Sequence, residues 1–279
     1  MNRQVKTKVK GYLTEDGAGV KLVRVLGNTT AEEFDPILML DSFDSLNPPD
    51  YTAGFPMHPH RGIETISYVS QGKMVHRDSL GNEDSVSDGE VQWMNSGSGI
   101  MHEEMVPAAE RLLGVQLWLN LPAKEKMSRP SYRHIGADSI EEVLFPGGKI
   151  RILAGSYEGH QGHRGDHLPL DYYDIHMDTG VEIVLKTEPE ASVMLFTLLG
   201  DISVEGEHIE EKTAVKLTAG DSVRIKSGAG PVQVLYMNSK ALNEPIAWSG
   251  PIVMNTTEDL IRAFSDLRDG TFIRQTAEY

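Results

Sequence analysis

The sequence predicts an all-β protein, built as β-sandwiches or barrels, with one helix near the C-terminus. Most of the chain consists of short apolar runs, many of them alternating, separated by Gly, Asn, Asp, Ser or Pro. Many short strands with closely spaced turns are typical of β-sandwiches and barrels. The long helices that would connect parallel strands are missing from the pattern. A chain of 279 residues exceeds one typical core, which favours two domains.

The predicted strands share an apolar character, and many show the two-residue alternation of a half-buried strand. They cover residues 19–27, 64–72, 90–94, 111–122, 149–157, 182–188, 192–200, 221–225 and 231–238. Between them, the sequences SQGK, LGNE, SDGE, LLGD and TAGD supply residues that tolerate positive φ. We therefore expect strand–turn–strand units in both halves of the chain.

The two halves resemble each other. ISYVSQGKMVH followed by SDGEVQWM has a counterpart in SVMLFTLLGDISV followed by TAGDSVRI. A strand–turn–strand unit, then a glycine turn and another strand, thus occurs twice, which predicts a duplicated β-domain. We place the domains at residues 1–133 and 134–279, with the polar segment Pro122 to Gly136 as their connection.

One helix is predicted for residues 255–270. Thr256 or Thr257 can cap its N-terminus, and acidic residues follow in the first turn. Its apolar residues recur at helical spacing and form one stripe: Leu260, Phe264 and Leu267. A second, shorter helix is predicted for residues 138–145.

The composition excludes several classes of protein. A formal net charge of −15 repels phosphate backbones, so direct nucleic-acid binding is not expected. The absence of cysteine excludes disulfides, thiolate metal sites and cysteine nucleophiles. No run approaches the roughly 20 apolar residues that span a bilayer, and no apolar stretch follows the N-terminal lysines. We expect a cytoplasmic protein that does not bind membranes.

The segment FPMHPHRGIETISYVSQG contains the first candidate ligands of a metal. His58 and His60 are two positions apart, so on an extended chain their side chains face the same way. Glu64 has the same parity. If this face points into a barrel, three ligands lie together over an apolar floor.

A second cluster, NSGSGIMHEEM, follows a glycine-rich turn. His102 and Glu104 share a face, while Glu103 points away. Two such pairs on neighbouring strands can close a site of three imidazoles and one carboxylate. This ligand set suits a divalent transition metal, and Fe(II) in particular. The spacing alone leaves Glu64 and Glu104 as alternatives for the carboxylate.

Long motifs in the chain resemble those of the pirin family, within the cupin superfamily. They are HPHRGIETISYVSQG, GEVQWMNSGSGIMHEE, GVQLWLNLP and GPIVMNTTEDL, and the match extends from about Asp16 to Phe272. The resemblance implies a bicupin, which has two jelly-roll-like antiparallel barrels. It also implies a single metal, usually iron, in the N-terminal domain. The implied ligands are His58, His60, His102 and Glu104. Glu64, which matches the ligand of the wider cupin superfamily, becomes an outer partner of an imidazole or of water.

The C-terminal domain is expected to bind no metal. When Gly200 is matched to Gly72 and Gly220 to Gly89, the positions of the five candidate ligands fall on other residue types. These are Lys186, Glu188, Ser192, Gln233 and Leu235. We therefore expect this domain to be structural.

The resemblance implies two functions. Some bacterial pirins resemble quercetinases, which open the central ring of a flavonol such as quercetin with O₂ and release carbon monoxide. In that role Glu104 would take the proton of the 3-hydroxyl group. Eukaryotic pirins resemble iron-dependent co-regulators of transcription, which implies the alternative of a non-catalytic iron-binding module acting through a protein partner. The expected small-molecule partners are a flavonol-like aromatic substrate and O₂, bound with one divalent metal, Fe(II) or another divalent ion.

Overall fold

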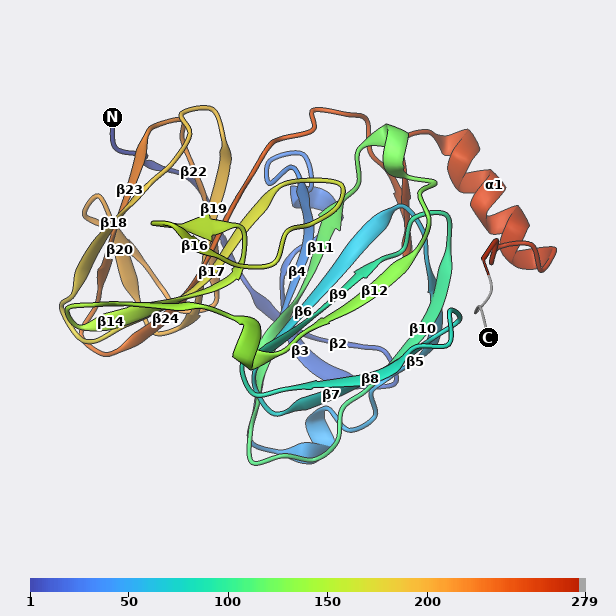
Figure 1. Ribbon diagram of the computed structural model, residues 1–279, viewed down its shortest axis with the longest axis horizontal. Coiled ribbons are helices and arrows are strands. Elements are labelled where there is room, and N and C mark those ends of the chain that lie inside the picture. The colour runs from blue at the N-terminus through green and yellow to red at the C-terminus, as the bar shows by residue number, and fades with distance from the viewer. Residues whose placement is uncertain (276–279) are drawn as a thin grey trace. The chain divides into compact units, whose positions relative to one another are not determined.

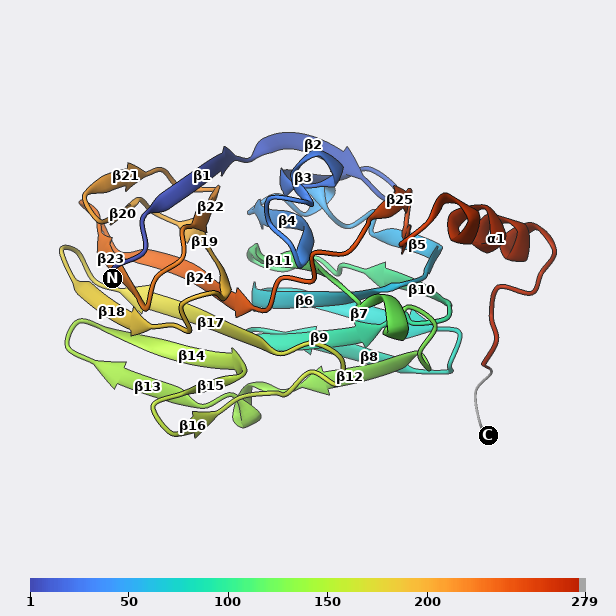
Figure 2. The ribbon, with the colours of Figure 1, turned by 90° about the horizontal axis from the view of Figure 1, so that it is seen from above.

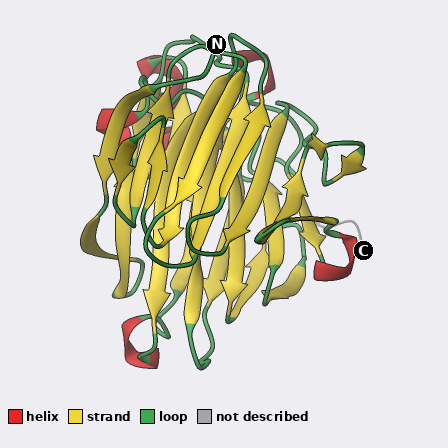
Figure 3. Ribbon diagram, turned by 90° about the vertical axis from the view of Figure 1, so that its left-hand side faces the viewer, coloured by secondary structure: helices red, strands yellow, loops and turns green. Residues whose placement is uncertain are grey.

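The computed structural model describes residues 1–275; residues 276–279, the end of the predicted second domain, lie outside this range. Strands dominate the described chain (Figure 3), and its one α-helix is α1 (Thr257–Arg268). The predicted all-β class with a C-terminal helix is therefore confirmed. No described helix is long and apolar enough to cross a membrane.

The chain divides into two compact units, which are described separately. The first unit contains Leu13–Glu32, Ile37–Ala137 and the chain from Leu242 onward. The second unit is formed by Met1–Tyr12, Glu33–Pro36 and Asp138–Ala241. The predicted boundary at residues 133 and 134 lies near the junction at Ala137. The predicted division does not hold for the two ends of the chain. Met1–Tyr12 belongs to the unit formed mainly by the second half, and the chain from Leu242 belongs to the unit formed mainly by the first half.

The first unit consists of two antiparallel sheets (Figure 1). The larger has the order β12-β9-β6-β11-β4-β3-β2 and the smaller β5-β10-β7-β8. The strands of the larger sheet are β2 (Tyr12–Asp16), β3 (Val20–Leu26), β4 (Ile37–Ser45), β6 (Ile63–Gln71), β9 (Glu90–Asn95), β11 (Leu112–Asn120) and β12 (Ser131–Ile135). Those of the smaller are β5 (Phe55–His60), β7 (Lys73–Asp78), β8 (Glu83–Ser87) and β10 (Ile100–Met105). Phe43 and Val69 of the larger sheet pack with Met74 and Val86 of the smaller, so one core joins both sheets.

The chain from Leu242 onward completes the first unit with a short hairpin and the helix. The hairpin pairs β25 (Ala247–Ser249) with β26 (Ile252–Met254), and Figure 2 shows α1 following it. Thr256 caps α1, since its hydroxyl accepts a hydrogen bond from the Asp259 backbone N–H at 3.1 Å. The predicted apolar stripe packs against β26 and Phe272, which confirms the predicted helix.

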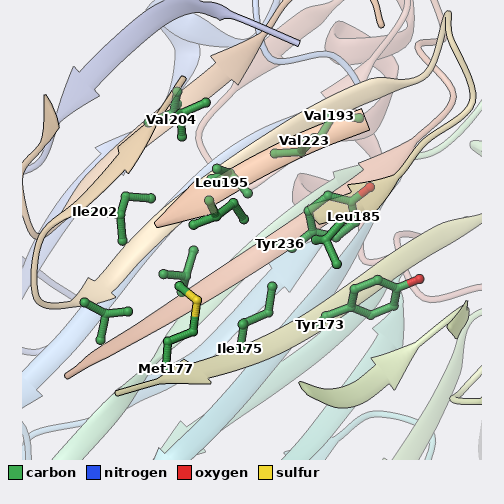
Figure 4. Packing of buried hydrophobic residues seen from close by; sticks show 14 of the residues in the cluster. Tyr173, Ile175, Met177, Leu185, Val193, Leu195, Ile202, Val204, Val223 and Tyr236 are labelled. Atoms are coloured by element: carbon green, nitrogen blue, oxygen red, sulfur yellow. The ribbon is translucent and has the colours of Figure 1, made fainter. Parts of the chain in front are cut away.

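The second unit also has two antiparallel sheets. The larger has the order β1-β22-β19-β24-β17-β14-β13 and the smaller β18-β23-β20-β21. The larger contains β1 (Val5–Lys10), β13 (Glu142–Phe145), β14 (Gly148–Ala154), β17 (Leu170–Met177), β19 (Ser192–Leu199), β22 (Thr213–Leu217) and β24 (Val232–Ser239). The smaller contains β18 (Glu182–Lys186), β20 (Ile202–Val204), β21 (Glu207–Ile209) and β23 (Ser222–Ser227), and β15 (Ser156–Tyr157) and β16 (His160–Gln161) form a separate hairpin. Figure 4 shows the core between the two sheets of this unit, in which Ile175 and Leu195 of the larger sheet meet Leu185 and Ile202 of the smaller.

The two units repeat one strand order. β9-β6-β11-β4 of the first unit corresponds to β22-β19-β24-β17 of the second, and β5-β10-β7-β8 corresponds to β18-β23-β20-β21. The corresponding strands also occur in the same order along the chain in both units. This common topology supports the predicted duplication.

The structure corrects one glycine match made from the sequence. Gly89 lies between β8 and β9, whereas Gly220 lies between β22 and β23. The two glycines are therefore not equivalent. Gln233 and Leu235 lie on β24, the counterpart of β11, and not on β23, the counterpart of the strand that carries His102.

Two local predictions in the middle of the chain are wrong. Residues 138–145 form no α-helix, because β13 pairs there with β14 after a short 3-10 turn at Ala137–Ser139. The predicted connection, Pro122 to Gly136, contains β12, which adds an edge strand to the larger sheet of the first unit. Pairing with a neighbouring strand overrides local preference in both segments.

Candidate metal centre

Two neighbouring strands of the first unit carry the candidate imidazoles. His58 and His60 lie on β5, and His102 lies on β10, directly opposite His58 in the antiparallel pair. The chain leaves β5 through Gly62, whose φ of +81° suits glycine. A Cβ atom there would lie 2.1 Å from the Val253 carbonyl oxygen, so a side chain would displace β26.

The three imidazoles converge on one point. A ligand nitrogen from each of His58, His60 and His102 lies within 4.8 Å of the other two. The Nε2 atoms of His58 and His60 are only 3.0 Å apart. His60 and His102 are buried and His58 is half-buried, so the group lies at the boundary between the barrel interior and solvent.

Backbone carbonyls determine which nitrogens face this point. Nδ1 of His58 lies 2.9 Å from the Pro56 carbonyl oxygen, and Nδ1 of His60 lies 3.0 Å from that of Pro251. A carbonyl oxygen only accepts, so each Nδ1 carries the hydrogen and each Nε2 presents a lone pair. The Nε2 atom of His102 is also buried and has no hydrogen-bond partner within residues 1–275.

The surroundings keep the buried rings neutral. Burial, with a smaller contribution from His58, lowers the pKa of His60 to about 3. Burial and the neighbouring imidazoles hold the pKa of His102 well below its usual range. Neutral imidazole is the form that binds a metal.

These observations fit a divalent transition metal. Facing lone pairs repel one another unless a cation or a proton lies between them. Three converging imidazole nitrogens form a common ligand set for zinc, copper, iron and nickel. Within the described residues this group contains no carboxylate.

The carboxylate of Glu104 lies inside the barrel on β10, two residues beyond His102, and is 1% exposed. Gln92 donates a short hydrogen bond to Oε1, and Gln116 donates one of 3.2 Å to Oε2. The Ser67 hydroxyl lies 3.3 Å from Oε1. Three uncharged groups therefore fix this carboxylate.

The other two glutamates of the motifs lie elsewhere. Glu103 forms an ion pair of 3.5 Å with Arg77, whose side chain is 55% exposed. Glu64 is buried on β6, opposite Asn95 of β9 and Leu119 of β11. The alternation along β5 does not extend to Glu64, because the chain turns after His60 and β5 and β6 belong to different sheets.

Several groups around the centre were not predicted from the sequence. Nδ1 of His76 lies 3.4 Å from Nδ1 of His102, and Asp78 lies behind His76. The signal was present, since His76 and Asp78 are two apart on a strand and share a face. Trp118 stands edge-on to His60 with a centroid distance of 5.0 Å, and Trp248 lies 5.7 Å from Trp118.

In the second unit, β18 and β23 correspond to the two strands that carry the imidazoles. Strand pairing aligns Val184 with Arg224 and Lys186 with Ser222. Arg224 pairs with Glu182 at 2.6 Å on the exposed surface. Neither of these two described strands contains a histidine.

Known proteins resemble this chain over nearly its whole length. The family model "Pirin" matches residues 19–119, and "Pirin C-terminal cupin domain" matches residues 172–273. A Pseudomonas aeruginosa protein that carries the provisional name quercetin 2,3-dioxygenase is 41% identical, covering 93% of this chain and 94% of its own. A pirin-like protein of Caulobacter vibrioides is 39% identical, covering 97% and 99%.

Solved structures agree in fold. A crystal structure named quercetin 2,3-dioxygenase, from Acinetobacter baumannii, has a TM-score of 0.90 at 28% identity, covering 98% of this chain and 99% of its own. Its similarity confirms the two-domain cupin fold expected from the motifs. From the matched family models and these relatives, we conclude that the chain belongs to the pirin family.

Proposed function

We propose that this protein is a metal-dependent dioxygenase that opens the ring of a flavonol such as quercetin. The observation that carries the proposal is the convergence of three imidazoles, those of His58, His60 and His102, on one point, with Glu104 buried two residues beyond His102 on the same strand. The proposed metal ligands are His58, His60, His102 and Glu104. A divalent ion held there, Fe(II) in the first place, supplies Lewis acidity and a capacity for electron transfer when bound.

Glu104 has the chemistry of the proton acceptor. The reaction begins when the 3-hydroxyl group of the flavonol loses its proton, which makes the ring electron-rich enough to react with O₂. In the proposal this proton moves to a carboxylate oxygen of Glu104. Gln92 and Gln116 donate hydrogen bonds to Glu104 and orient it without adding charge. Both atoms of O₂ enter the product, and one ring carbon leaves as carbon monoxide.

The surroundings of the imidazoles suit a flat aromatic substrate. Trp118 and Trp248 form an aromatic surface that continues from His60. Aromatic rings favour edge-to-face or offset contacts with other rings, which gives an orientation as well as affinity. The apolar core that joins the two sheets of this unit limits the access of water from the interior.

The similar proteins support the substrate class. Two of those reported above carry the name quercetin 2,3-dioxygenase, one of them provisionally, and both match nearly the whole chain. The imidazoles and the carboxylate do not by themselves distinguish an oxygenase from a redox-sensing module, because both would use the same ligands.

Turnover tests the proposal. The protein is loaded separately with iron, manganese, cobalt or nickel and mixed with a panel of flavonols in air. We expect the visible absorbance of the flavonol to fall, with uptake of one O₂ and release of one carbon monoxide for each molecule consumed. His60→Ala should abolish all three signals. His208→Ala should not change them, because that ring lies exposed in the second unit.

A fully metal-loaded protein that consumes none of the flavonols would contradict the dioxygenase. Flavonol binding without loss of absorbance would favour the alternative, an iron-binding module that acts through a protein partner. Activity that survives His60→Ala would place the reaction outside this centre.

A further inference from the structure

A buried histidine–aspartate pair lies directly behind His102. His76 and Asp78 lie on β7, the strand next to β10 in the smaller sheet of the first unit. Nε2 of His76 lies 2.9 Å from Oδ2 of Asp78, and both side chains are 0% exposed. On the other side of the ring, Nδ1 of His76 lies 3.4 Å from Nδ1 of His102, a long hydrogen bond. The three side chains form a line that ends at the candidate metal centre.

Asp78 is the acceptor at the outer end of this line. Its Oδ1 atom accepts hydrogen bonds from the backbone N–H groups of Leu80 and Asn82 at 2.8 and 3.1 Å. Its Oδ2 atom accepts a third from the Asn82 side-chain amide at 2.8 Å. All of these partners are donors, so the carboxylate acts only as an acceptor. The hydrogen between Asp78 and His76 therefore belongs to Nε2 of His76.

The position of this hydrogen on His76 also determines the tautomer of His102. A neutral imidazole with its hydrogen on Nε2 has a lone pair on Nδ1. Nδ1 of His76 is then an acceptor, and Nδ1 of His102 must donate to it. His102 is left with a bare Nε2 atom, which is the buried atom that has no hydrogen-bond partner among the described residues. The opposite tautomer would bury an N–H group without an acceptor, which is unfavourable.

We propose that Asp78 and His76 form a hydrogen-bond relay that holds His102 in the tautomer whose Nε2 atom binds the metal. Both are positioning residues, and neither is a ligand. Tyr132 fixes the relay from β12, since its ring stacks on His76 with a centroid distance of 4.2 Å and an interplanar angle of 16°. His102 would then be oriented by a carboxylate through a second imidazole, whereas His58 and His60 are oriented by backbone carbonyls. The inference rests on the metal centre of the proposed function and not on its substrate.

The wild-type protein gives the first test. Long-range ¹H–¹⁵N correlation spectra of the zinc-loaded, ¹⁵N-histidine-labelled protein report the hydrogen on each ring nitrogen. We expect His76 with its hydrogen on Nε2 and a bare Nδ1, and His102 with its hydrogen on Nδ1. A hydrogen on Nδ1 of His76, with Nε2 bare, would overturn the relay. This arm needs no substitution, so it stands even if a variant fails to fold.

Substitution of His76 gives the second test. His76→Phe keeps a ring to stack on Tyr132 but removes the acceptor, so the zinc affinity measured by competition with a chelator should fall 10–100-fold. His76→Gln offers an amide oxygen as acceptor and should restore most of that affinity. His134→Phe is the matched control, because His134 lies in the same unit and pairs with Asp84 and Glu90. The unfolding temperature of each metal-free variant is measured alongside.

The outcomes distinguish a hydrogen-bonding role of His76 from a role in packing alone, and they are independent of the proposed reaction. A folded His76→Phe protein that binds zinc as tightly as wild type would overturn the relay, and so would a His76→Gln protein as weak as His76→Phe. The measurements of zinc affinity and of the histidine tautomers do not depend on catalytic turnover. The relay can therefore hold in a protein that consumes no flavonol, and it can fail in one that does.

Discussion

Two backbone carbonyl oxygens and one buried imidazole determine how the three histidines present their nitrogens. Each of these three groups lies at hydrogen-bond distance from the Nδ1 atom of one histidine. The Nε2 atoms are then left for the proposed metal. These contacts favour the tautomer that the proposed metal centre needs, and they do so without an ion. A site whose ligands are already oriented loses less conformational freedom on binding, and this favours high affinity.

Glutamate substitutions test the proposed fourth ligand. Glu104→Gln should lower metal affinity by more than the roughly 10–100-fold typical of an outer partner, because it replaces a charged ligand. Glu64→Gln should have a smaller effect. Glu103→Gln, the adjacent control, should have almost none, since that side chain faces Arg77. Chelator competition with one metal under one buffer measures all three, and a larger loss from Glu64→Gln would reverse the assignment.

A buried lysine in the second unit predicts a pH dependence of stability. Burial lowers the pKa of Lys216 to about 8, and its ammonium group lies beside Ser192 and the Asp35 carbonyl oxygen. Between pH 8 and 10.5 the unfolded chain keeps a proton that the folded chain has lost, so the free energy of unfolding should rise with pH in this window. Denaturant titrations of wild type and Lys216→Met should diverge by about 2 kcal/mol between pH 7.5 and 9.5. Parallel pH profiles would contradict the assignment.

The residue types of the centre could be read from the sequence, but several of their partners could not. The two-residue period of a strand correctly put Glu104 and Glu103 on opposite sides of β10. It could not place Glu64 relative to His58, because the alternation of one strand does not continue through the turn at Gly62. The carbonyl of Pro251 lies 191 residues from His60, and no local pattern connects them.

At the scale of elements, Arg61 connects the end of β5 to the helical C-terminal segment. Its guanidinium donates hydrogen bonds to the Ser98 carbonyl at 2.8 Å, to Asp266 of α1 at 2.7 Å and to the Phe272 carbonyl at 3.1 Å. It also lies over the Phe272 ring, 4.2 Å from the centroid. One buried side chain therefore holds together a ligand strand, the loop before β10 and the region around α1.

Replacement of Arg61 should disturb both stability and the metal centre. Arg61→Met keeps the aliphatic stem but leaves Asp266 and two carbonyl oxygens without this donor, at an expected cost of about 3–5 kcal/mol in the free energy of unfolding. Metal affinity should fall as well, since Arg61 follows His60 directly. Arg77→Met, which removes exposed ion pairs with Glu83 and Glu103, is the control and should change stability far less. Equal effects of the two variants in chemical denaturation would contradict this role.

The strength of each local pattern explains which elements were predictable. The apolar residues of α1 recur at helical spacing, and a threonine cap precedes them. The sequence alone therefore defines that helix. Residues 138–145 carry too weak a pattern, and their strand exists because Val143 and Phe145 pack against the core of the second unit while β13 pairs with β14. Edge strands of this kind depend on a neighbour that local propensity does not reveal.

At the scale of the whole molecule, each terminus belongs to the unit built from the opposite half of the chain. The first residues add β1 to the edge of β22, and Arg3 is fully buried there. Its guanidinium donates to the Thr218 carbonyl at 2.6 Å, to the Glu188 carbonyl at 2.7 Å and to the Thr187 hydroxyl at 2.8 Å. Family motifs identify the two domains but do not reveal this exchange, because it arises from pairing between distant segments.

Deletion of residues 1–11 should therefore weaken the second unit. The loss of β1 and of the hydrogen bonds of Arg3 should lower its free energy of unfolding by about 3 kcal/mol or more. Hydrogen exchange followed by mass spectrometry should show faster exchange in β19 and β22 than in β6 and β11. Faster exchange confined to the first unit, which follows the deletion directly in sequence, would contradict the division.

The Pro251 carbonyl that accepts the hydrogen of His60 has a consequence for how the protein is made. A ribosome that adds about 5–20 residues per second needs roughly 10–40 s to travel from His60 to Pro251. Once His102 has been added, the nascent chain contains all three imidazoles, but the group that selects the tautomer of His60 has not yet been synthesised. The proposed centre is therefore expected to reach its full metal affinity only after Pro251 has left the ribosome and docked against His60.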